Sequence, residues 1–116
     1  MPVFSDPRFE RMRTYMTGEY PYVQVFDPEL GKVHARVRGW VQGELFIEYP
    51  PNGARWVYNG RLDVKWVPTV TATRIRQADS IWRSAGDNHT WHQREDAKIK
   101  YRTDPWTVLG QDPHGH

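Results

Sequence analysis

The sequence predicts a mainly β protein: a small antiparallel barrel with a short N-terminal helix and an extended C-terminal arm. Valine outnumbers leucine and isoleucine together, and six Trp, six Tyr and four Phe suit pleated sheets better than helices. Short apolar runs between residues 21 and 78 are separated by Gly, Pro and Asn turns, with no helical period between them. A meander of this kind buries one face by closing or folding over, which favours a barrel.

By pattern the chain divides into an N-terminal helical segment at residues 1–20, the β barrel at residues 21–78 and a C-terminal extension at residues 79–116. A length of 116 residues fits one domain with a single core. The lack of cysteine leaves no disulfide or thiolate site, and the chain starts without an apolar leader. No run approaches the roughly 18 apolar residues of a membrane span. We therefore expect a soluble protein with no membrane partner.

The first expected element is a short helix. Asp6 suits the N-cap, Pro7 suits the first helical position and Gly18 stops the helix, which predicts a helix over residues 8–17. One apolar stripe follows at helical spacing, made of Phe9, Met12 and Met16. We expect this stripe to pack on the sheet, with a partner-binding helix as the alternative.

Strands are predicted at residues 22–26, 33–41, 45–49 and 70–76, with turns at residues 27–32 and 42–44. The second of these strands alternates cleanly, with Val33, Ala35, Val37 and Val41 on one side and His34, Arg36, Arg38 and Trp40 on the other. Gly39 interrupts the apolar side, where a bulge or a close backbone approach is the usual reason for a strand glycine.

The strongest local signal is the pair Asn59-Gly60, because a type I′ hairpin turn needs positive φ at both central residues. This turn would set the register of two strands and sort their side chains by a period of two. One face then carries Val57, Leu62, Val64 and Trp66. The other face carries Trp56, Tyr58, Arg61, Asp63 and Lys65, and we expect it to meet solvent or a partner.

After residue 79 the pattern changes. Residues 79–83 fit a single helical turn that residues 86–88 stop, and the remainder mixes polar residues, proline and glycine. Three widely spaced aromatics, Trp91, Tyr101 and Trp106, cannot make a core of their own. We expect them to anchor an extended arm to this domain or to another chain.

The candidate binding residues are aromatic and cationic side chains of the outer face and the arm: Arg36, Arg38, Trp40, Trp56, Tyr58, Arg61, Lys65, Trp91 and Trp106. Trp, Tyr and Arg are enriched in protein interfaces, and aromatics among cations also suit stacked bases and phosphates. Three interpretations stay open: cover by the chain's own helix or arm, a protein partner, or nucleic acid. Between residues 31 and 76 eight Lys and Arg stand against three acids, but the whole chain carries only +2, a weak footprint for nucleic acid.

Signals for catalysis are weak. His89, His92 and Glu95 lie close in sequence, but the completing ligands of a metal site are missing at the expected spacing. Asp63, Glu44 and Glu48 offer a conceivable carboxylate pair, although neutralising nearby arginines is the simpler role. Phosphate loops, nucleophile motifs and dinucleotide fingerprints do not occur in the sequence. We expect no metal, no cofactor and no enzymatic activity.

The run VHARVRGWVQGELFIEY at residues 33–49, the Asn-Gly turn and the closing run at residues 72–76 resemble a Tudor-type or other SH3-like barrel. Tudor domains that bind methylated side chains use an aromatic cage, but no cage position can be matched here. In overall style the chain is similar to small proteins of actinobacterial viruses, rich in arginine, tryptophan and proline. Small barrels with extended termini serve tailed phages as head-tail connector and stopper subunits, which form rings.

We therefore expect a non-enzymatic structural or assembly protein, a phage virion component such as a head-tail connector, in the virion or the host cytoplasm. It would dock on neighbouring subunits as a homo- or hetero-oligomer, through the aromatic-basic face and the C-terminal arm. The alternative is an SH3-like module that binds nucleic acid or a host protein. Steep salt dependence of binding would distinguish the nucleic-acid form of that alternative.

Overall fold

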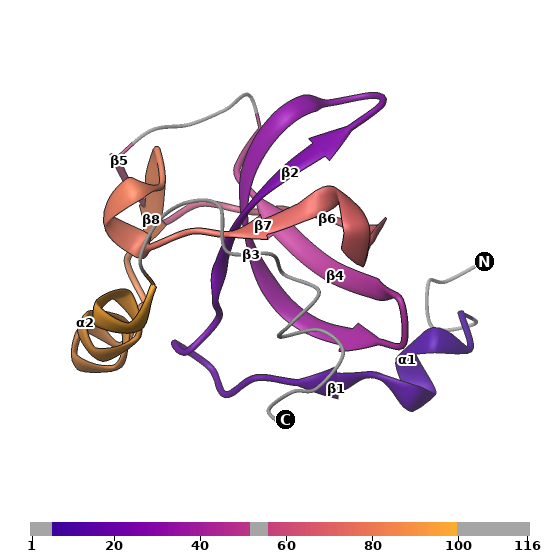
Figure 1. Ribbon diagram of the computed structural model, residues 1–116, viewed down its shortest axis with the longest axis horizontal. Helices are drawn as coiled ribbons and strands as arrows, with labels where there is room; N and C mark the ends of the chain where they lie inside the picture. Colours follow the sequence, from indigo (N-terminus) through magenta and orange to yellow (C-terminus); the bar gives the residue numbers. More distant parts are fainter. Residues whose placement is uncertain (1–5, 52–55, 100–116) are drawn as a thin grey trace.

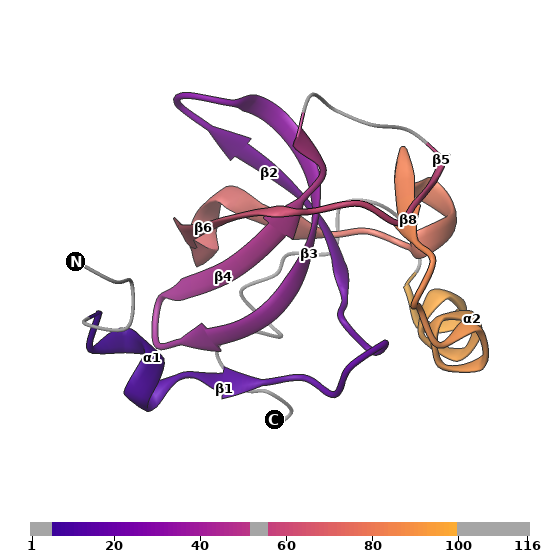
Figure 2. The same cartoon turned by 180° about the vertical axis from the view of Figure 1, so that it is seen from behind.

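The protein is built from one antiparallel sheet and one separate parallel pair of strands (Figure 1). Its computed structural model describes residues 6–51 and 56–99. The elements in chain order are α1 (Arg8–Arg11), β1 (Arg13–Thr14), β2 (Tyr22–Asp27), β3 (Gly31–Val41), β4 (Glu44–Tyr49), β5 (Trp56–Tyr58), β6 (Asp63–Pro68), η3 (Thr69–Thr71), β7 (Ala72–Arg74), η4 (Gln77–Asp79), β8 (Trp82–Ser84) and α2 (His89–Lys98). Antiparallel pairing runs in the order β6-β4-β3-β2-β7, and β1 adds to β3. β5 and β8 form a separate parallel pair, which Figure 2 shows beside α2.

The main core lies inside the curl of the six-stranded sheet, against the five strands β6, β4, β3, β2 and β7. Its buried side chains come from all five strands and are at most 5% exposed: Val23, Val25, Ala35, Val37, Leu45, Ile47, Val67 and Ala72. The strands predicted at residues 22–26, 33–41 and 45–49 are present as β2, β3 and β4, and Gly31 and Gly43 have positive φ in the turns between them. The prediction of a mainly β antiparallel fold with a short N-terminal helix is therefore confirmed. Among the described strands, β6 and β7 end the sheet without pairing with each other.

Ion pairs join β6 to the β2–β3 turn at the open side of this sheet. Lys65 Nζ lies 2.9 Å from Asp27 Oδ1 and 2.7 Å from Glu29 Oε1. Asp27 Oδ2 also accepts the backbone N–H groups of Glu29 and Leu30, both at 2.9 Å, which fixes the turn itself. Lys65, predicted to point towards a partner, is thus engaged within the chain.

A β-bulge in β3 changes which side chains face the core. The register with β4 shifts between Val37 and Gly39, so that Trp40 pairs with Leu45 and packs against the main core. A Cβ on Gly39 would lie 2.5 Å from the carbonyl oxygen of Arg13, because β1 passes directly over this position. The predicted bulge and close approach at Gly39 are confirmed. The predicted outward orientation of Trp40 is wrong, because the extra residue reverses the alternation.

We expect Gly39→Ala to lower the free energy of unfolding by about 1–3 kcal/mol, the usual cost of overpacking. The new methyl group needs space that the Arg13 carbonyl and the Met12 sulfur, 2.9 Å from the Cβ position, already occupy. Gly86→Ala is the matched control, since the nearest atom there is 3.9 Å away, and we expect a change within about 0.5 kcal/mol. Urea unfolding measures both. Equal stability of the two variants would contradict the close packing of β1 on β3.

The predicted Asn59-Gly60 hairpin is wrong. β6 pairs with β4 along its whole length, β5 pairs with β8, and β5 and β6 do not pair with each other. The described glycines with positive φ are Gly18, Gly31 and Gly43, so Gly60 does not supply the left-handed residue of a type I′ turn. The two strands on either side of the Asn-Gly pair therefore belong to different sheets, β5 with β8 and β6 with β4.

The predicted faces of that hairpin are wrong in part. Val57 is 63% exposed and Val64 is 49% exposed, although both were expected to point inward. Leu62 and Tyr58 are half-buried instead, packed against a second core cluster of Tyr22, Ile75 and Trp82. This cluster lies on the outer face of the main sheet, under β5 and β8.

The N-terminal helix begins where the sequence predicts but ends six residues early. Met12 is already extended, and the next two residues pair with β3 as β1. The expected packing of the apolar stripe is confirmed for Phe9, whose ring lies 5.0 Å from Phe46 and 5.6 Å from Trp66. Met16 is 72% exposed, because the strand conformation breaks the helical stripe.

The part of the chain after residue 76 contains more regular structure than the pattern indicates. η4 and β8 replace the expected helical turn at residues 79–83, and α2 occupies the start of the expected arm. Asn88 caps α2 by accepting the Trp91 N–H at 3.0 Å. Asp96 on α2 accepts the backbone N–H of Gln77 at 2.8 Å, which holds the helix to η4. Within residues 6–51 and 56–99 no helix is long and apolar enough to cross a membrane.

Candidate functional site

The predicted aromatic and cationic residues do not form one outer face. Arg36 is only 7% exposed and Trp40 packs on the core, so the expected outward orientation of both is wrong. Arg38 and Arg61 are exposed, whereas Tyr58 and Trp91 are half-buried. The side chain of Trp56 and the whole of Trp106 lie outside the described residues. Partner binding by this set stays a prediction.

Arg36 lies at the centre of a buried ion-pair network on the outer face of the sheet. Its Nη2 contacts the Glu48 carboxylate, its cross-strand neighbour on β4, and its Nη1 donates to Asp87 Oδ1 at 2.7 Å. Arg38 reaches the same Glu48 from the rim at 3.7 Å. Both guanidinium groups also lie over the ring of Tyr20, at 5.0 and 5.7 Å from its centroid. Two arginines thus balance two buried carboxylates, as buried charges require.

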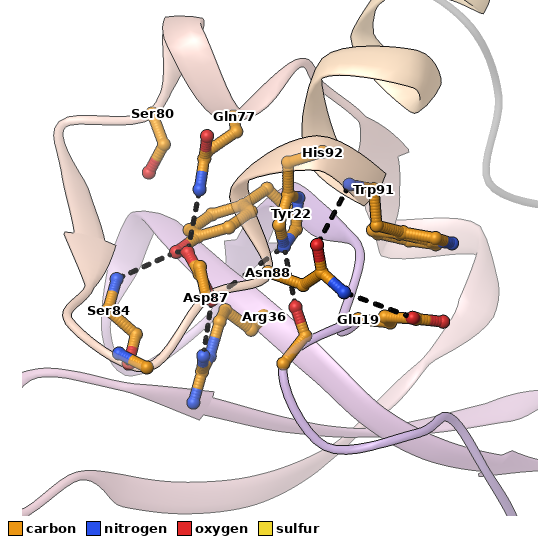
Figure 3. A network of polar contacts seen from close by, with 12 residues as sticks. Glu19, Tyr22, Arg36, Gln77, Ser80, Ser84, Asp87, Asn88, Trp91 and His92 are labelled. Carbon is orange, nitrogen blue, oxygen red and sulfur yellow. Dashed lines mark hydrogen bonds and ion pairs between the residues drawn. The ribbon is translucent and has the colours of Figure 1, made fainter.

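Asp87 collects donors from three different elements, as Figure 3 shows. In addition to Arg36 of β3, it accepts from the Tyr22 hydroxyl of β2 and from Gln77 Nε2 of η4, the latter at 2.7 Å. The Tyr22 oxygen in turn accepts the backbone N–H of Ser84 at 2.9 Å. Burial and the hydrogen bond to Asp87 raise the pKa of Tyr22, which keeps its hydroxyl protonated as a donor. Asp87 therefore ties the segment around β8 to the main sheet.

His92 closes the network on the side of α2. Its Nε2 donates to the carbonyl oxygen of Gly18 at 3.1 Å and lies 3.7 Å from Asp87 Oδ1 (Figure 3). Because a carbonyl can only accept, Nε2 carries the proton of the neutral ring. Burial lowers the pKa of His92, although the negative charge of Asp87 opposes this shift.

We expect the free energy of unfolding to fall as the pH drops below about 6.5, the ordinary pKa of histidine. The pKa of His92 is lowered in the folded state, so the unfolded chain binds the proton first. The contribution is fully present above the unfolded pKa and is lost as the pH falls through the folded one. Urea unfolding at several pH values measures it. His92→Gln should flatten the slope, whereas His89→Gln, an exposed position on the same helix, should leave it unchanged; equal slopes in both variants would contradict this assignment.

Burial decides what the network can do chemically. The side chains of Arg36, Glu48, Asp87 and His92 are only 3–8% exposed, so a substrate cannot reach them without opening the fold. The network is therefore an internal tie between α2, β8 and the sheet. Within the described part of the chain no three His, Cys, Asp or Glu residues gather in a way that could hold a metal ion. Glu48 neutralises arginines as predicted, and Glu44 does the same for Arg8 at 2.9 Å.

A surface with exposed apolar residues lies on the outward side of the β5–β8 pair, which the ion-pair network holds to the sheet. Val57 and Arg83 are cross-strand partners, both exposed, and Ile81 just before β8 is 47% exposed. Trp82 between them points inward, where its Nε1 donates to the carbonyl oxygen of His34 at 2.7 Å and its side chain is 1% exposed. We call Val57, Ile81 and Arg83 the outer ribbon surface.

Most of the cations between residues 31 and 76 form ion pairs within the chain. Arg36, Lys65, Arg74 and Arg76 each contact a carboxylate of the same chain. Arg38 pairs with Glu48 as well, so five of the eight cations between residues 31 and 76 contact a carboxylate. This pairing weakens the attraction of the segment for a polyanion.

Sequence reasoning singled out Arg36, Arg38 and Glu48 but missed the other members of the network: Tyr22, Gln77, Asp87 and, as a tie, His92. They come from distant positions, and their partners become apparent only when β8 and α2 fold back on the sheet. One local signal was available, because Asn88 is a strong N-cap residue and indicates a helix starting at residue 89. α2 has no apolar stripe, and its buried residue is a histidine, so hydrophobic periodicity could not reveal it.

Comparison of the chain with protein-family models, curated proteins and solved structures found no match.

Proposed function

We propose that this protein is a non-enzymatic structural or assembly subunit that docks on neighbouring protein subunits through the outer ribbon surface. The observation that carries the proposal is the pair Val57 and Ile81, 63% and 47% exposed on a ribbon whose other side is anchored by buried Trp82. Apolar groups on a pre-ordered element lose little conformational entropy on binding, which favours an interface. Arg83 beside them belongs to a residue type enriched in interfaces.

The strand arrangement supports an SH3-like assignment for this subunit. The sheet has strand, short turn and strand in β2, β3 and β4, and β7 adds as an edge strand beside β2. On its similarity in style to small phage proteins, we place the subunit in a virion, as a head-tail connector or a related component. The C-terminal residues, which lie outside the described part of the chain, are the second contact of this proposal.

A module that binds nucleic acid is the second candidate, favoured by exposed cations such as Arg61 and Arg83. It ranks below the assembly role because of the internal pairing of the other cations. Binding of DNA or RNA that weakens steeply with rising salt would support it, and binding insensitive to salt would contradict it.

We expect Val57→Asp and Ile81→Asp to weaken self-association at least about tenfold, because a charge in an apolar contact must lose its hydration. Sedimentation velocity over a concentration series measures the effect. Val70→Asp is the matched control: Val70 is 81% exposed but lies on η3, away from the ribbon, and should leave association unchanged. A wild-type chain that sediments as a monomer alone and with the products of neighbouring genes would contradict the proposal.

A further inference from the structure

A cavity of about 410 Å³ lies between α2 and the segment that contains β1. Trp91, Glu95 and Lys98 form its α2 wall, since residues spaced by four and three lie on one face of a helix. Thr14 and Tyr15 contribute to the opposite wall. The volume is at the lower end of the range of about 300–1,000 Å³ typical of ligand sites, which suits one large side chain with the main chain around it.

β1 presents a strand edge to this cavity. Arg13 pairs with Trp40, Thr14 with Gly39, and the N–H of Tyr15 donates to the Arg38 carbonyl at 3.1 Å. In an antiparallel pair the main-chain groups point alternately towards the partner strand and away from it. The N–H and C=O of Thr14 therefore point away from β3, and Thr14 lines the cavity.

We infer that this cleft binds an extended peptide segment of a protein partner by strand addition to β1, with a large apolar side chain in the cavity against Trp91. Strand addition uses main-chain hydrogen bonds for affinity and a side-chain pocket for specificity, and the cleft offers both. Glu19 and Lys98 line it with opposite charges, which suits the mixed polar groups of a peptide better than a single ionic ligand. The inference rests on the proposed function and describes the chemistry of a further contact between this protein and a partner.

The test uses the full-length ¹⁵N-labelled chain and the synthetic peptide acetyl-Val-Thr-Trp-Thr-Val-amide, titrated by NMR. We expect shifts of the Thr14 amide and the Trp91 indole N–H. Thr14→Pro removes the outward N–H, a change that strand edges tolerate, and should weaken binding at least about tenfold. Thr14→Ala keeps the N–H and should bind as the wild type does.

If Thr14→Pro does not fold, a probe methylated on its central nitrogen tests the complementary hydrogen bond on the wild-type chain and should bind more weakly. No shift of Thr14 at millimolar probe overturns the inference, and so does binding that neither change affects. Exclusion of the probe by the chain's own C-terminal residues also overturns it. If the chain self-associates but does not bind the probe, this inference alone is wrong. If the chain is monomeric but binds the probe, only the proposed docking through the outer ribbon surface is wrong.

Discussion

Asp87→Ala is expected to lower the free energy of unfolding by about 3–5 kcal/mol, the range for removing one partner from a buried charge pair. The Asp87 side chain is 5% exposed, and its loss leaves Arg36 with a single firm carboxylate, Glu48. It also removes the acceptor of the Tyr22 hydroxyl and of Gln77 Nε2. Buried donors without a partner incur their full desolvation cost, so the effect exceeds that of one lost hydrogen bond.

Urea unfolding followed by tryptophan fluorescence measures this change. Asp63→Ala is the matched control, because Asp63 is exposed on β6, and its removal should change stability by no more than about 0.5 kcal/mol. Hydrogen exchange adds a local readout: α2 and β8 should lose protection before β2, β3 and β4 in the Asp87 variant. An Asp87 variant as stable as the Asp63 variant would show that the network does not hold the C-terminal segment.

Trp82→Ala should cost about 3–5 kcal/mol, the usual loss for a large aromatic side chain removed from a core. Trp82 is 1% exposed, packs edge-on against Tyr22 at 5.6 Å between ring centroids, and donates its indole N–H to the His34 carbonyl. Its removal leaves a large cavity in the second core cluster, whose other buried members are Tyr22 and Ile75. The β5–β8 pair then loses the anchor that holds it on the sheet.

Ile81→Ala, next to Trp82, serves as the control, because Ile81 is 47% exposed and its truncation opens no enclosed cavity. Thermal unfolding should separate the two variants clearly, with a small effect at Ile81 and a large one at Trp82. Self-association should respond to both, since one variant removes part of the outer ribbon surface and the other removes its support. Similar stability of the two variants would contradict the burial of Trp82.

Local patterns were sufficient where one strand follows the next along the chain. The alternation in residues 33–41 and the glycine turns predicted β2, β3 and β4, because consecutive antiparallel strands pair through short loops. The alternation also placed Ala35 and Val37 on the side of the main core. Even the bulge was indicated by Gly39. The effect of the bulge on Trp40 was not indicated, since the direction of the Trp40 side chain depends on where one extra residue enters the ladder.

Predictions failed where a segment distant in the sequence supplied the partner of a strand or side chain. Asn59-Gly60 favours a hairpin locally, yet β6 pairs with β4, and β5 pairs with β8 from more than twenty residues further on. The candidate site failed in the same way. Arg36 was expected outside because its strand alternates, but a carboxylate from residue 87 folds over it and buries it.

Composition, turn residues and alternation in this sequence determined a mainly β antiparallel sheet, its central strands and the inward side of β3 up to the bulge, because those depend on neighbours in the chain. The tertiary structure alone decided that the outer face is covered, that Arg36 is a buried tie and that Val57 and Ile81 are exposed. The physical reason is that a strand has two faces and two edges, and its own pattern cannot show which later segment covers the second face or pairs with the second edge.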